Sequence, residues 1–107
     1  LAAGRTGAAG EAALMAEYGG QTQVRMMTSH GLRVLDNLLG LVGRESKVGR
    51  AYLTASARMQ IAKDTELLAT GALEAVEWHF FRGATGVGPS APLAAALEAA
   101  GIRVVVH

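Results

Sequence analysis

The stretch VRMMTSHGLRVLDNLLGLV, residues 24–42, decides the fold that we predict for this chain. Its apolar residues recur at intervals of three and four, which is the spacing of one face of a helix. The predicted stripe contains Val24, Met27, Gly31, Val34, Leu38 and Leu41, and it is widened by Leu35, Leu39 and Val42. Gly43 then serves as a C-terminal cap. The pattern predicts a long amphipathic helix packed inside a bundle.

Helical patterns also lie on both sides of this stretch. Residues 11–18 are rich in Ala and end at Gly19-Gly20, so they predict a short helix. Residues 46–78 predict either one kinked helix or two helices that meet near 64–71, where Gly71 could bend the chain. The fold class predicted from these segments is mainly α, a small helical bundle of three or four helices.

The C-terminal part changes character at HFFRGATGVGPSAP, residues 79–92. Ser90 and Pro92 suit the start of a helix, Gly101 ends that helix, and residues 102–106 are strongly β-prone. We therefore expect three parts. Residues 1–10 form a flexible N-terminal arm, residues 11–82 a helical body, and residues 83–107 a glycine loop, a short helix and a terminal strand arm.

The segment Gly83-Ala84-Thr85-Gly86-Val87-Gly88, followed by a helix and then Ile102–Val106, resembles the first β-α-β unit of Rossmann-type dinucleotide-binding domains. The resemblance implies a phosphate held by loop amides at a helix N-terminus. One alternative function is therefore a nucleotide- or phosphate-binding fragment that uses residues 83–91. The other interpretation is a flexible linker, which we prefer because Pro89 stands where an N–H donor is needed.

Charge and composition restrict the partners. The chain of 107 residues has a formal net charge of +1 with both signs dispersed, which argues against nucleic acid as a partner. Arg44, Lys47 and Arg50 form a short basic row that Glu45 interrupts, so a small helical nucleic-acid-binding regulator is a further alternative. Residues 1–107 contain no cysteine, and no apolar run reaches the length of a signal peptide core or a membrane span, which predicts a soluble protein without disulfides.

No catalytic residues are predicted. Ser29, His30 and Asp36 do not form a triad, because adjacent residues point apart on the predicted helix. The carboxylates Glu66 and Glu74 are not placed as an acid–base pair. We expect a non-enzymatic protein with no cofactor.

The three histidines, His30, His79 and His107, are far apart in sequence, so no metal is predicted. If residues 76–81 form a strand, however, Glu77 and His79 share one of its faces, and His107 could approach from a neighbouring strand.

The terminal strand supports the functional prediction. Its backbone groups need partners, and residues 76–81 are the candidate within the chain, but a two-stranded parallel pair is seldom stable alone. We therefore predict a structural or assembly subunit, homo-oligomeric or part of a larger particle such as a virion, with protein as its partner. The expected interface residues are Trp78, Phe80, Phe81, Ile102, Val104 and Val106.

Overall fold

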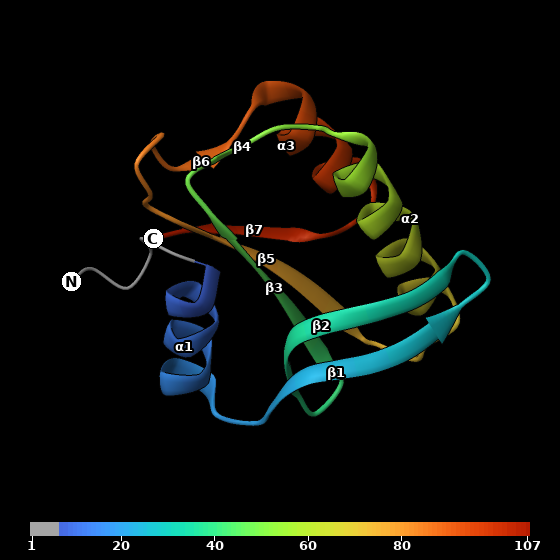
Figure 1. Cartoon of the computed structure of the whole chain (residues 1–107). Coiled ribbons are helices and arrows are strands. Elements are labelled where there is room, and N and C mark those ends of the chain that lie inside the picture. Colours follow the sequence, from blue (N-terminus) through green and yellow to red (C-terminus); the bar gives the residue numbers. More distant parts are fainter. Residues whose placement is uncertain (1–6) are drawn as a thin grey trace.

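A computed structural model of the chain describes residues 7–107 and has a mixed α/β fold (Figure 1). The predictions of a mainly α fold and of a helical bundle are therefore wrong. The helices are α1 (Gly7–Tyr18), α2 (Ala55–Ala69) and α3 (Ala91–Ala99). The strands are β1 (Gln21–Thr28), β2 (Gly31–Leu39), β3 (Val42–Val48), β4 (Arg50–Ala51), β5 (Ala75–Phe81), β6 (Gly88–Pro89) and β7 (Arg103–Val106).

Five strands form one sheet in the order β1-β2-β3-β5-β7. The first three are an antiparallel meander, whereas β3, β5 and β7 run parallel to one another. The short strands β4 and β6 form a separate parallel pair. In Figure 1, α1 lies on one side of the sheet, and α2 and α3 lie on the other. The sheet is thus the middle of three layers, and each face of β3 contacts a different helical layer.

Residues 24–42 form a hairpin and the start of a third strand rather than a helix. Gly31 and Gly40 have φ values of 109° and 59°, which a helix does not contain. Each lies at a reversal of the chain, after Thr28 and after Leu39. The apolar spacing is misleading because Met27 is 73% exposed, although it belongs to the predicted buried stripe. The correct period is that of a strand, in which every second residue faces the core, as Val24 and Met26 do.

The predicted helical region at 46–78 contains one helix between two strands. The Thr54 side chain accepts a hydrogen bond from the Ala57 backbone N–H at 3.1 Å and caps the start of α2, which ends before Thr70. The chain then enters β5, whose residues from Val76 to Phe81 are all buried. β5 is a central strand covered on both faces, and this burial explains its run of large apolar side chains.

The C-terminal predictions are confirmed in outline. Ser90 caps α3 with Pro92 in its first turn, and the following strand pairs in parallel with β5, with Glu77 opposite Arg103. Because β5 also pairs with β3, the terminal strand completes a five-stranded sheet within the chain. The two-stranded pair on which the assembly prediction relied is therefore not formed.

The predicted N-terminal arm lies only partly within the described residues. Its residues 1–6 fall outside them, and residues 7–10 belong to α1, where Gly10 packs against the sheet. No helix in residues 7–107 is both long and apolar enough to cross a bilayer.

Candidate active site at the fork between β2 and β3

The strands β2 and β3 separate partway along their length. Their backbone pairing runs from Leu39 opposite Val42 to Asn37 opposite Arg44. At the next step, the Ser46 backbone N–H donates to the Asp36 side chain at 2.7 Å. Beyond this point β2 pairs with β1, and β3 continues beside β5. The Asp36 carboxylate therefore lies where the two strands diverge, a position that we call the fork.

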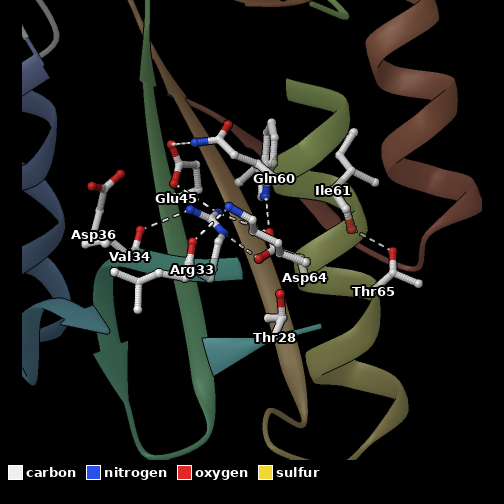
Figure 2. Close-up of polar contacts among 12 residues, drawn as sticks. Thr28, Arg33, Val34, Asp36, Glu45, Gln60, Ile61, Asp64 and Thr65 are labelled. Atoms are coloured by element: carbon white, nitrogen blue, oxygen red, sulfur yellow. Dashed lines mark hydrogen bonds and ion pairs between the residues drawn. The ribbon is translucent and has the colours of Figure 1, made fainter. Parts of the chain in front are cut away.

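Glu45 and Lys47 project from β3 at the fork on the face covered by α2. They are two residues apart, so a strand places both on one face. The Lys47 ammonium lies 3.2 Å from Glu45 Oε2 and donates to Gln60 Oε1 on α2 at 2.7 Å. Figure 2 shows Glu45 between Gln60 and the guanidinium of Arg33. A carboxylate, an ammonium and an amide thus meet on this face of β3, on either side of Ser46, whose backbone N–H bonds to Asp36.

A buried ion pair holds Arg33 against Glu45. Arg33 Nε lies 2.7 Å from Asp64 Oδ1, and its Nη2 lies 3.1 Å from Asp64 Oδ2, which is a bidentate geometry (Figure 2). The same Nη2 lies 3.0 Å from Glu45 Oε1. Trp78 Nε1 donates to Asp64 Oδ2 at 2.9 Å, and Asp64 has no exposed surface. Asp64 therefore positions Glu45 indirectly, because it fixes the orientation of Arg33.

Both carboxylates at the fork have pKa values above their ordinary range. Burial raises the pKa of Asp36, and the negative charge of Glu11 adds to this effect, while the Ser46 N–H, Arg33 and Lys47 oppose it. Burial also raises the pKa of Glu45, with a further increase from the charge of Asp36. The negative charge of Asp36 thus acts on the pKa of Glu45 in the same direction as burial, and a cation bound at the fork would oppose both effects.

The outer wall of the fork is formed by Glu11 on α1 and Gln23 on β1. Gln23 Nε2 donates to Glu11 Oε1 at 2.5 Å. Among the described residues, Gln23 is the non-glycine residue with a positive φ, at 53°. Its neighbours Thr22 and Val24 pair with Asn37 and Leu35, which places Gln23 across from Asp36. Strained backbone of this kind concentrates at functional sites.

The sequence-based interface residues are mostly internal to the chain. Trp78 and Phe80 have no exposed surface, and Phe81 and Ile102 are also buried. Val104 and Val106, on the edge strand β7, are 37% and 54% exposed. A protein interface formed by the six predicted residues would thus use Val104 and Val106, and such an interface stays a prediction.

The predicted convergence of Glu77, His79 and His107 is present on the other face of the sheet. His79 Nε2 lies 2.9 Å from Glu77 Oε1, and His79 Nδ1 lies 2.8 Å from His107 Nε2. Burial lowers the pKa of His79, and Glu77 also accepts from Arg44 and Arg103. The carboxylate is thus occupied by cations of the chain itself, which favours a structural role for the cluster.

The glycine loop and the basic row are arranged differently from their predicted forms. Gly83 and Gly86 hydrogen-bond to each other in both directions, so their amides are used within the loop. The nucleotide-binding alternative therefore gains no geometric support. Arg44 is buried on the face of Tyr18, 3.5 Å from its ring centroid, whereas Lys47 lies at the fork and Arg50 is exposed on β4. The three cations do not share one helical face.

Sequence reasoning missed the combination of Asp36, Glu45 and Lys47. The signal was Glu45-x-Lys47 in a short segment bounded by Val42 and Val48, preceded in the sequence by Asp36. It was hidden because Asp36 and Lys47 were assigned to two different helices and Glu45 to the link between them, so no shared strand face was considered. No family model, curated protein or solved structure matches the chain.

Proposed function

We propose that the chain is a nuclease that hydrolyses phosphodiester bonds with the help of a divalent cation. The observation that carries this proposal is that Asp36 accepts from the Ser46 backbone N–H, between Glu45 and Lys47, whose side chains pair with each other while Gln60 bonds to Lys47. Carboxylates that can hold a hard cation, next to a fixed ammonium, are the groups that phosphoryl transfer requires.

The residues fit a magnesium-type site. Mg²⁺ is usually held by one or two carboxylates, with water and substrate phosphate completing its octahedron. Residues 7–107 contain no group of three or more acidic or histidine side chains arranged as a metal cage. Asp36 and Glu45 would therefore hold the cation as a pair. When bound, the cation polarises a phosphoryl oxygen and lowers the pKa of a coordinated water.

Lys47 supplies a positive charge at a fixed position. Its ammonium is held by Gln60 Oε1 at 2.7 Å, and it lies 5.0 Å from the centre of the Trp78 ring. In hydrolysis, a water oxygen bonds to phosphorus while the bond to the leaving ester oxygen breaks, and negative charge builds on the phosphoryl oxygens. A preorganised ammonium stabilises that charge more in the transition state than in the ground state. We therefore assign Lys47 to charge stabilisation.

The sequence predicts a non-enzymatic assembly subunit, and no observation on the chain tests that prediction directly. The arrangement at the fork favours an enzyme because two carboxylates with raised pKa values accompany a lysine held by Gln60, and perturbed pKa values cluster at functional sites. An exposed edge at β7 remains compatible with self-association as an additional property.

The experiment compares purified wild-type protein with Asp36→Asn and Lys47→Met on circular DNA, linear DNA and RNA, with Mg²⁺ or Mn²⁺ or with EDTA. We expect cation-dependent cleavage by the wild type and a loss on the order of 10²-fold or more in each variant. Arg82→Gln, an exposed cation after β5, is the matched control and should cleave normally. Circular dichroism verifies that the variants fold.

Two results would reject the proposal. One is a wild-type protein that cleaves none of the three substrates with either cation. The other is a folded Asp36→Asn variant that cleaves as fast as the wild type, because the reaction would then belong to another site or to a contaminant.

A further inference from the structure

A groove leads away from the fork between β2 and α2. It has a volume of about 350 Å³ and is lined by Leu32, Arg33, Val34, Ser56, Met59, Gln60 and Lys63. Gln60 is shared between this groove and the fork, because it also bonds to Lys47 and faces Glu45. A molecule in the groove would therefore contact Gln60, which also bonds to Lys47 at the fork.

The wall and the floor of the groove differ in chemistry. Ser56, Gln60 and Lys63 occur at intervals of four and three on α2, so they share one helical face. Leu32 and Val34 of β2 are apolar, and Met59 is 45% exposed. The β2 side thus offers apolar surface, and the α2 side offers polar and cationic groups together with the Met59 side chain. An unpaired nucleic acid strand has the matching division between phosphates and base faces.

The far end of the groove is fixed by contacts between α2 and the turn after β1. Ser29 donates to the Glu66 carboxylate through its backbone N–H, at 2.7 Å, and through its hydroxyl. Lys63 Nζ donates to the Leu32 backbone oxygen at 2.8 Å, which holds the ammonium at the rim. From Ser56 to Lys63 the helix rises about 10 Å, at 1.5 Å per residue. At the stacked B-form rise of about 3.4 Å per nucleotide, this length corresponds to roughly three nucleotides.

From these features we infer that the groove binds one strand of nucleic acid next to the phosphate that is cleaved. Lys63 contacts a backbone phosphate of that strand, and Met59, Leu32 and Val34 contact its sugars and bases. This inference rests on the proposed nuclease function, because the bound strand is the substrate of the reaction at the fork.

The test measures binding separately from cleavage. A fluorescently labelled single-stranded DNA oligonucleotide is titrated with the Asp36→Asn protein, and its anisotropy is recorded over a range of salt concentrations. This background prevents the expected cleavage and removes one negative charge that would repel phosphate. In it, Lys63→Gln should weaken binding about fivefold at 0.1 M salt and make the plot of log K against log salt shallower by about 0.7, the value for one phosphate contact.

Two further variants complete the comparison. Met59→Glu changes an exposed side chain and should weaken binding about tenfold by repelling phosphate. Arg58→Gln is the matched control, because Arg58 lies on the same helix but lines a different pocket with Ile61 and Ala96. It should bind like the background protein. Thermal denaturation confirms that each variant is folded.

The outcomes separate this inference from the proposed function. If the wild type cleaves DNA but Lys63→Gln and Met59→Glu bind like the control, the groove assignment is overturned and the nuclease proposal stands. If the background protein binds no oligonucleotide even at low salt, the groove assignment is again overturned. Cleavage by the wild type then decides the nuclease proposal independently.

Discussion

Replacement of Asp64 by asparagine should destabilise the chain severely, although Asp64 lies outside the fork. The carboxylate has no exposed surface and accepts three hydrogen bonds, two from Arg33 and one from Trp78. Asparagine keeps the shape of the side chain but loses its charge. Its N–H₂ group also replaces one acceptor oxygen and then faces the donors of Arg33 or Trp78. The guanidinium of Arg33 then remains buried with Glu45 as its one charged partner among the described residues.

The magnitude follows from the cost of breaking a buried ion pair, about 3–5 kcal/mol. A domain of this size has a total stability of about 5–15 kcal/mol. At about 4 °C per kcal/mol, the midpoint of thermal unfolding should fall by roughly 12–20 °C. Urea unfolding followed by fluorescence is a direct assay, because Trp78 is the single tryptophan and donates to Asp64.

Thr65→Ala is the matched control for this measurement. Thr65 is the next residue, it is exposed, and its hydroxyl bonds to the Ile61 oxygen of the same helix. Its replacement should change the free energy of unfolding by less than about 0.5 kcal/mol. A cost below about 1 kcal/mol for Asp64→Asn, with an unchanged m value, would refute the argument that this pair organises the α2 side of the sheet.

Two further predictions concern the fork and the packing of α1. Because the pKa of Asp36 is raised in the folded chain, its contribution to stability is present below the unfolded pKa of about 3.9 and is lost as pH rises through the folded pKa. Asp36→Asn should therefore be more stable than the wild type at pH 7 but not at pH 4, and equal pH profiles of the two proteins would contradict this. Mg²⁺ should raise the melting temperature of the wild type but not that of Asp36→Asn. Gly10→Ala should cost about 1–3 kcal/mol in urea unfolding, because its Cβ would overlap the Ser46 hydroxyl and lie 3.0 Å from the Val48 side chain. Gly7→Ala, with no atom within 4 Å of the added Cβ, is the control and should be neutral or stabilising.

The sequence was informative where local chemistry determines local structure. The cap at Ser90, the stop at Gly101 and the β-prone end at 102–106 predict α3 and β7, and the glycine pair after Tyr18 predicts the end of α1. The parallel pairing of residues 76–81 with the terminal strand was also predictable. In each case, a cap, a breaker or a β-branched run acts within a few residues.

The meander of β1, β2 and β3 could not be predicted in this way, because the spacing of its apolar residues fits both the period of a helix and the period of a strand. Leu35 is buried and Leu39 is exposed, so an apparent helical stripe is divided between the core and solvent. Arg33 and Glu45 are buried together between the sheet and α2. Their burial depends on Asp64, which pairs with Arg33 and is distant from it in sequence. Such compensation comes from tertiary contacts, which override local propensity. The candidate site was therefore invisible until the strands were aligned.

The fork has a consequence for how activity would arise during folding. Asp36, Glu45 and Lys47 belong to one antiparallel hairpin, yet the groups that orient them come from α2, through Gln60 and Asp64. The hairpin by itself would leave these charges fully hydrated and unaligned. Docking of α2 both dehydrates them and sets their orientation, so catalytic competence should appear together with cooperative folding, and a partly unfolded chain should be inert rather than indiscriminately reactive.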